Sequence, residues 1–251
     1  SVTWEKNPDY WGYDEKFPQN RLPYIDEYRS LLMPDMSTRL AALRTGKIDY
    51  MGNTGDVNIY SVDDLDTLQR TNPEIEVWSV YEQAPDPFLF NWALPPVSDV
   101  NVRKALQMAV DRETISATYF KGYGDPTPGG LLSQNVAKGF YWPYEEWPEE
   151  VKKGYRYDPA GAEELLDEAG YPRGADGIRF KTNLVWHDAQ DLSYIELLAA
   201  TYYRDIGVDV VIEALPGQQL RPRRAAGDYD GINNTMAATG TGSPWGMMAK
   251  L

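Results

Sequence analysis

The chain has 251 residues, 42% of them hydrophobic and 25% charged, which is the balance of a folded globular protein. Its net charge of −14 argues against a nucleic-acid partner, and the absence of cysteine excludes thiol catalysis, thiolate metal sites and disulfides. No apolar stretch reaches the roughly 18–20 residues that cross a bilayer. No signal-peptide pattern is present, so we expect any such peptide to be absent or already removed.

The first third of the chain predicts short strands and helices. After a turn-rich loop over 7–12, Asp35 or Ser37 can cap a helix. Gly46 ends that helix, because glycine tolerates the left-handed conformation that often follows a helix. The other expected elements are strands at 24–33, 48–51 and 75–81 and a helix at 62–70.

The middle of the chain combines one well-marked helix with a long irregular stretch. A short apolar strand is expected at 88–92, and Asp99 is the expected N-cap of a helix whose apolar residues repeat at helical spacing. From Gly122 to Gly154 the sequence is rich in glycine, proline and aromatic residues and shows little periodicity. Such a stretch is uncommon inside a compact domain and is usually functional or packed over a surface.

The last hundred residues alternate between helices and strands. Asp158 and Pro159 are an N-cap followed by a proline at the first helical position, and Gly170 ends that helix. The further expected elements are strands at 178–186 and 208–214, helices at 192–204 and 218–226, and a strand from Tyr229. Connections of this length permit parallel pairing, so the sequence predicts an α/β fold.

The sequence offers no set of catalytic or cofactor-binding residues. His187 is the only histidine, and neither a nucleophile elbow nor a paired-histidine zinc motif is present. Neighbouring acids such as Glu163 and Glu164 point apart on a helix, whereas general acid–base work needs two carboxyl groups facing across a bond. We therefore expect no enzyme activity, no cofactor and no metal site.

Aromatic residues make up 13% of the chain, with eight Trp and 18 Tyr but only six Phe. Trp and Tyr join a flat apolar face to a polar group, which suits a surface that binds a ligand. Trp92, Trp186 and Trp245 lie near the ends of expected strands, and His187 follows a strand end, where α/β proteins hold ligands. Together they indicate an aromatic-lined cleft, while for each ring alone the alternative is core or loop packing.

Several motifs, taken in their order along the chain, resemble one known family. They include Asn7-Pro8-Asp9-Tyr10-Trp11, Ser37-Thr38-Arg39-Leu40-Ala41-Ala42-Leu43-Arg44-Thr45-Gly46-Lys47-Ile48-Asp49, Asp99-Val100-Asn101-Val102-Arg103-Lys104-Ala105, Tyr157-Asp158-Pro159 and Gly227-Asp228-Tyr229-Asp230. Each motif alone is modest, but their order over nearly the whole chain is specific. The chain resembles the family 5 extracellular solute-binding proteins, which are peptide, nickel and oligosaccharide receptors of ABC importers.

The resemblance implies a two-lobed, periplasmic-binding-protein-like α/β fold of type II, in which the lobes close on a ligand about a hinge. It implies part of lobe I at residues 1–84, a nearly complete lobe II at 85–231, and a return segment toward lobe I at 232–251. Asn91 and the stretch after Asp230 would mark the two crossings between the lobes.

The resemblance also bears on the ligand. Peptide-binding relatives carry an aspartate that pairs with the ligand's α-amino group, and an ungapped count places Thr239 at that position. Without that charge, a neutral oligosaccharide becomes the preferred candidate beside an oligopeptide, and nickel is disfavoured by the single histidine and absent cysteine. The expected ligand-binding residues are Asn91, Trp92, Trp186, His187, Thr239 and Trp245.

The expected function is therefore the substrate-binding component of an ABC importer, which binds an oligosaccharide or oligopeptide in an interlobe cleft without chemistry. We expect a monomer whose partner is a membrane permease. It would lie outside the cytoplasm, in the periplasm or at the outer face of the cell membrane, where a lipid anchor on a missing N-terminal section is one means of attachment. The alternatives are a carbohydrate-active enzyme, such as a glycoside hydrolase, and a plain protein-interaction domain.

Overall fold

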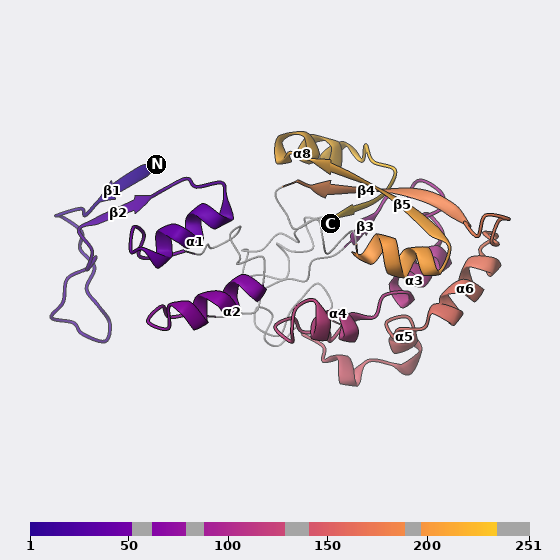
Figure 1. The fold of residues 1–251 in the computed structure, drawn as a ribbon, viewed down its shortest axis with the longest axis horizontal. Coiled ribbons are helices and arrows are strands. Elements are labelled where there is room, and N and C mark those ends of the chain that lie inside the picture. Colours follow the sequence, from indigo (N-terminus) through magenta and orange to yellow (C-terminus); the bar gives the residue numbers. More distant parts are fainter. Residues whose placement is uncertain (52–61, 79–87, 129–140, 189–196, 235–251) are drawn as a thin grey trace. The chain divides into compact units, whose positions relative to one another are not determined.

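The computed structural model describes residues 1–51, 62–78, 88–128, 141–188 and 197–234. The chain forms two compact units, unit 1 at Ser1–Glu76 and unit 2 at Val77–Leu251. Figure 1 labels most elements of both units, and each unit is described by itself.

Unit 1 contains a two-stranded sheet and two helices. They are β1 (Val2–Glu5), β2 (Glu27–Ser30), α1 (Met36–Arg44) and α2 (Val62–Thr71), with the two strands antiparallel. The Asp35 carboxylate accepts a hydrogen bond from the Thr38 backbone N–H at 2.7 Å, and Gly46 adopts φ +64 just after α1. Both predicted ends of α1 are therefore confirmed.

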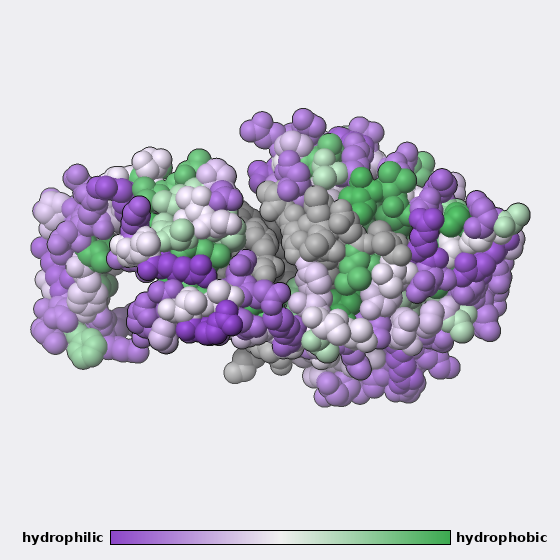
Figure 2. Space-filling view, in the orientation of Figure 1, coloured by the Kyte–Doolittle hydropathy of each residue, from purple (hydrophilic) through white to green (hydrophobic). Residues whose placement is uncertain are grey.

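Most large hydrophobic side chains of unit 1 are exposed. Trp11 and Leu32 are 82% and 85% exposed, and the ring of Trp4 packs at a tilt against that of Tyr28 on the neighbouring strand, with ring centroids 5.4 Å apart. On the face shown in Figure 2, hydrophobic residues of this unit are interspersed with hydrophilic ones. The buried apolar side chains among its described residues are Leu40, Ala42 and Leu68, so this unit has a small core.

Unit 2 contains a four-stranded sheet with helices on both faces. Its elements are β3 (Phe88–Phe90), α3 (Val100–Met108), α4 (Arg112–Thr118), η1 (Tyr144–Glu146), α5 (Glu149–Lys153), α6 (Pro159–Glu168), β4 (Phe180–His187), η2 (Leu198–Tyr203), β5 (Val208–Leu215), α8 (Gly217–Ala226) and β6 (Gly231–Asn234). In the sheet order β3-β6-β4-β5, β4 pairs parallel with both β5 and β6, whereas β3 pairs antiparallel with β6. The predicted α/β fold with parallel pairing is confirmed.

The helices of unit 2 cover the sheet because β4 is apolar on both faces. Leu184 and Trp186 belong to a core cluster with residues of α3 and α6, such as Leu106 and Leu166. Val185 points to the opposite face by the alternation of a strand, and α8 lies over that face (Figure 1). The two apolar faces thus hold the sheet between two helical layers.

Helix caps in unit 2 follow the sequence prediction closely. Asp99 accepts from the Asn101 backbone N–H at 2.7 Å, and Asp158 accepts from the Gly161 backbone N–H at 2.9 Å, so both predicted N-caps form. Gly170 adopts φ +85 after α6, as a residue that ends a helix does.

Several predicted strands are shorter or absent. The strand expected at 24–33 forms only as β2, and 48–51 is not a strand, nor are residues 75–78 at the start of the third; 79–81 lie outside the described residues. A β-propensity pattern becomes a strand only where a neighbouring strand completes its ladder, and the described residues provide none here.

Two helical regions also differ from the prediction. The stretch 122–154, expected to be irregular, contains the short helices η1 and α5. The helix expected at 192–204 has a π-helical part, η2, while 192–196 lie outside the described residues. The last strand begins at Gly231, two residues after the predicted Tyr229.

Candidate ligand-binding site

The pairing of β3 with β6 fixes where the chain enters and leaves the sheet of unit 2. Phe88 is the register partner of Asn234, and Phe90 is the partner of Ile232. The first residue of β3 and the last residue of β6 are therefore side by side, on the edge where β4 and β5 end at His187 and Leu215. In open α/β sheets this carboxyl edge is where ligands bind.

Asn91 ties the opposite end of this strand pair together. Its backbone N–H donates to Gly231 O at 2.8 Å, and its side-chain Nδ2 donates to Tyr229 O at 2.8 Å and to Gly227 O at 3.2 Å. The amide donors of Asn91 are thus used inside the protein. Since Gly231 is also the partner of Asn183, Asn91 lies level with the middle of β4, roughly 13 Å along the strand from His187.

His187 lies at the carboxyl edge and is partly exposed. It is the last residue of β4, whereas the sequence predicted a position just after the strand. Its Nδ1 is 3.7 Å from the Asp188 carboxylate, and its ring faces the first residue of α8. A Cβ atom at Gly217 would come within 2.6 Å of His187 Nε2, so a side chain at 217 would require the imidazole ring to shift. His187 therefore sits beside the N-terminus of α8, where backbone N–H groups carry partial positive charge.

Trp186 points away from His187. Its side chain is 2% exposed and belongs to the core on the α3 and α6 side of the sheet, where Nε1 has no hydrogen-bond partner among the described residues. In this structure the ring is a core side chain and does not reach the surface. The sequence could not show this, because the neighbouring residues of a strand face opposite sides and either one could have been the outward one.

Trp92 is 79% exposed and follows Asn91, away from the carboxyl edge. Thr239 and Trp245 lie outside the described residues. Of the predicted residues that are described, the structure brings Asn91 and Trp92 together at one end of β3 and places His187 at the other edge. A direct role of any of these residues in ligand binding stays a prediction.

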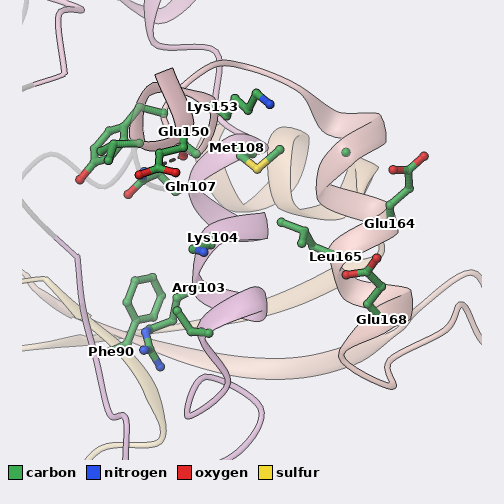
Figure 3. Close-up of a pocket in the computed structure, with 15 residues that line it drawn as sticks. Phe90, Arg103, Lys104, Gln107, Met108, Glu150, Lys153, Glu164, Leu165 and Glu168 are labelled. Atoms are coloured by element: carbon green, nitrogen blue, oxygen red, sulfur yellow. Dashed lines mark hydrogen bonds between the residues drawn. The ribbon is translucent and has the colours of Figure 1, made fainter. Parts of the chain in front are cut away.

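A cavity of about 840 Å³ lies elsewhere, between α3, α5 and α6 (Figure 3). Phe90, Lys104, Met108, Glu164 and Leu165 are among the residues that line it, and none of the four predicted ligand-binding residues that the structure describes does. The cavity therefore belongs to the helical layer of unit 2 and is separate from the predicted site at the carboxyl edge.

The ionisable groups of unit 2 mainly hold the fold together. Arg179 is 3% exposed in its side chain and donates to Glu163 at 2.9 Å, to Tyr171 O at 2.8 Å and to Asp167. The Arg173 guanidinium, and then Arg179, hold the pKa of the Glu163 carboxyl below its usual range. Among the described residues, no group of three or more His, Asp or Glu side chains could hold a metal ion.

Sequence reasoning missed the close contact between Gly231 and β4. Gly231 has φ +92, and a Cβ atom there would overlap Thr182 Oγ1 and come within 2.9 Å of Asn183 O. A glycine at a strand start is a known signal of close backbone approach, so this contact was open to prediction.

Comparison with known proteins decides the family. The model of the bacterial extracellular solute-binding proteins, family 5 (middle), matches residues 1–251. The chain belongs to this family. The resemblance seen in the ordered motifs is therefore confirmed.

Similar curated proteins are named for several ligands. The chain is 27% identical over 218 residues to the glutathione-binding protein GsiB of Shigella flexneri, covering 86% of the chain and 37% of that protein. It is 29% identical over 236 residues to the nickel-binding periplasmic protein of Escherichia coli (89% and 40%) and 30% identical over 160 residues to heme-binding protein A of Haemophilus influenzae (64% and 26%). The chain thus spans less than half of each of these relatives.

Solved structures agree with the fold. NikA from Brucella suis in complex with Fe(III)-EDTA matches with a TM-score of 0.70 at 25% identity, covering 93% of this chain and 44% of that one. The periplasmic binding protein DppA from Helicobacter pylori, in complex with the peptide STSA, matches with a TM-score of 0.70 at 24% identity, covering 93% and 39%. The chain is part of a two-lobed periplasmic binding protein fold, as predicted.

These comparisons also bear on activity and location. GsiB and the two other curated relatives are named as binding proteins, which confirms the prediction of a solute-binding protein that is not an enzyme. The family is extracytoplasmic, as expected, and no helix in the described part of the chain is long and apolar enough to span a membrane. None of these names refers to a sugar, so they lend no support to the expected preference for oligosaccharides.

Proposed function

We propose that this chain is the central part of the substrate-binding component of an ABC importer, which binds a small peptide-type ligand between two lobes and does no chemistry. The observation that carries the proposal is the family match over residues 1–251. Relatives and structural neighbours named for glutathione and peptides support this class of ligand. Closure of the lobes would signal occupancy to a membrane permease, with the binding protein acting as a monomer.

The lobe boundaries form part of the proposal. Residues 1–84 would belong to lobe I, and lobe II would run from 85 to the end of β6 at Asn234, because β6 is a strand of the unit 2 sheet. The return toward lobe I would follow β6, three residues later than the expected boundary at 231. Because Phe88 and Asn234 are partners at the same end of the β3–β6 pair, the segments before β3 and after β6 start from one edge of the sheet. This arrangement supports two adjacent linkers, which is what a hinge between lobes requires.

The proposed ligand is a peptide whose α-amino group is not held by an aspartate. By the ungapped count, Thr239 takes the position of that acid in peptide-binding relatives, and a lost charge-assisted hydrogen bond weakens binding by about 1.5–3 kcal/mol. We therefore expect free and N-acetylated forms of one peptide to bind with similar affinity.

The experiment is a thermal-shift and calorimetry screen on the full-length gene product and on the 251-residue chain. The panel contains glutathione, a tripeptide and its N-acetylated form, a nickel–histidine complex and an oligosaccharide. A ligand at 100 times its Kd raises the free energy of unfolding by about 2.7 kcal/mol, which this assay detects. Stabilisation of the full-length protein by the oligosaccharide alone would refute the peptide proposal.

A substitution tests the role of Thr239 directly. Thr239→Asp should strengthen binding of the free tripeptide about tenfold or more and leave the N-acetylated form unchanged, because only the free amine gains a charge partner. Thr241→Asp adds the same charge two residues away and should not discriminate between the two peptides. Equal effects of both variants would show that net charge, and not the position, matters.

A further inference from the structure

The cavity between α3 and α6 has an apolar floor. The two helices pack side by side, and Met108 and Leu165 lie between them at the centre of the cavity (Figure 3). Gly161 lies against this floor, since a Cβ atom there would be 3.0 Å from Met108 Cε and 2.5 Å from Asp158 Oδ2. Val151, which is 42% exposed, adds an apolar side chain from α5. We call this feature the α3–α6 groove; its volume is about 840 Å³.

The two walls of the α3–α6 groove carry opposite charges. Arg103 and Lys104 line the α3 side, whereas Glu164 and Glu168 line the α6 side, and α5 adds one charge of each sign, Glu150 and Lys153 (Figure 3). The Arg103 guanidinium donates to Val97 O and Ser98 O, each at 2.8 Å, so Lys104 is the α3 charge that faces a partner. The two glutamates are four residues apart, so they lie on one face of α6, separated by roughly 6 Å of helical rise. Lys104 and both glutamates are exposed and form no ion pair or hydrogen bond with described residues.

The neighbouring acids of α6 are used in a different way. Glu163 accepts hydrogen bonds from Arg173 and Arg179, each at 2.9 Å, and Asp167 accepts from Arg179. Helix α6 therefore carries two acids that are paired inside the protein and two acids that face the groove. The groove acids are not needed to balance the internal arginines.

We propose that the α3–α6 groove docks an amphipathic helical segment of a partner protein. Two packed helices form a furrow that can receive a third, and an apolar stripe flanked by charges is the pattern of helix-in-groove recognition. The partner helix would carry two basic residues one turn apart against Glu164 and Glu168, and an acidic residue toward Lys104. Complementary charges of this kind set orientation and specificity.

A synthetic peptide serves as the probe. It is a labelled helix of roughly 18 residues, long enough to form a helix, with a leucine stripe, a Lys pair one turn apart on one flank and a Glu pair on the other. Its net charge is zero, so the acidity of the protein does not attract it. Fluorescence anisotropy should show binding to the whole chain that weakens with salt. Absence of binding at low salt would overturn the proposal.

Charge reversal then tests the site. Glu164→Lys/Glu168→Lys should weaken binding roughly tenfold, because two attractive pairs become repulsive. The same variant should bind better to a peptide whose two glutamates replace the lysine pair on that flank. Glu15→Lys/Glu113→Lys changes the net charge equally at two exposed acids outside the groove and should leave binding within twofold of the parent.

A second variant tests the apolar floor of the groove. Val151→Asp places a carboxylate beside the apolar floor and should abolish probe binding, with circular dichroism showing that the fold is retained. Equal binding by the reversed, control and Val151→Asp variants would overturn the proposal. So would a concentration-dependent dimer in sedimentation velocity that Glu164→Lys/Glu168→Lys breaks, since the groove would then serve a second copy of this chain.

Discussion

The side-chain amide of Asn91 donates a hydrogen bond to the backbone carbonyl of Tyr229 at 2.8 Å, across 138 positions of sequence. This bond joins the end of β3 to the approach to β6, the two segments that run antiparallel in the sheet of unit 2. The sequence marked Asn91 as the site of a crossing and as a ligand contact, whereas the structure shows that its amide links the two segments.

Replacing Asn91 should therefore reduce stability. Asn91→Ala removes two donors and leaves the Tyr229 carbonyl without this partner, which should lower the free energy of unfolding by about 1–2 kcal/mol in urea denaturation. Asn101→Ala is the control, since the Asn101 side chain makes no hydrogen bond with described residues. An unchanged unfolding midpoint for Asn91→Ala would show that the tie contributes nothing to stability.

Gly231 should be more sensitive than other glycines with positive φ. Gly231→Ala combines an unfavourable φ of +92 with overlap between the new Cβ atom and Thr182 Oγ1. We therefore expect this variant to lower the free energy of unfolding by more than about 3 kcal/mol. At Gly170, where φ is +85, a Cβ atom would have no heavy atom within 4 Å. Gly170→Ala should therefore lower the free energy of unfolding by about 1 kcal/mol, through the unfavourable φ alone.

A double variant separates the two causes. Thr182→Ala removes the overlapping hydroxyl, so Thr182→Ala/Gly231→Ala should recover part of the loss relative to Gly231→Ala in the same unfolding assay. Equal destabilisation by Gly170→Ala and Gly231→Ala would contradict the close approach.

Local signals explain why much of the fold was predictable. Asp35, Asp99 and Asp158 cap their helices because a carboxylate placed just before the first helical residue accepts hydrogen bonds from the free N–H groups of the first turn, and this depends on neighbours in sequence. Parallel strands were expected from the helix–strand alternation, which is also a local pattern.

What could not be predicted depends on distant partners. The residues at 48–51 have strand-forming side chains but lack a ladder, and pairing is a property of the whole fold. Trp186 and His187 are adjacent in sequence yet point to opposite faces of β4, and only the placement of α6 and α8 decides which face is covered by which helix. The same holds for the salt bridges of Arg179, which lies just before β4 and whose partners Glu163 and Asp167 come from α6.

The two tryptophans predicted as ligand contacts should respond differently to substitution. Trp186→Ala removes a ring that is 2% exposed and should lower the free energy of unfolding by about 3–5 kcal/mol. Trp92→Ala removes a ring that is 79% exposed and should change it by less than about 0.5 kcal/mol. A ligand contact at Trp92 would then appear as a lower affinity in calorimetry without any change in the thermal midpoint. Unchanged affinity would remove Trp92 from the site.

The stability of unit 2 should depend on pH through Glu163. Arg173 and Arg179 hold the pKa of the folded Glu163 carboxyl below its ordinary value of 4.5, so the folded state binds this proton less readily than the unfolded state. The resulting stabilisation is fully present above the unfolded pKa and is lost as the pH falls through the lower folded pKa. Urea unfolding measured from pH 7 down to pH 3 should show this loss.

Two neutral substitutions isolate that contribution. Glu163→Gln removes the titrating carboxylate and should flatten the acid limb of the stability profile, while lowering stability at pH 7 because Arg173 and Arg179 lose their shared acceptor charge. Glu164→Gln changes the next residue, which has no ion pair among the described residues, and should leave the profile unchanged. If both variants keep the acid limb of the parent, other carboxylates must govern the acid sensitivity, and Glu163 would have no measurable part in it.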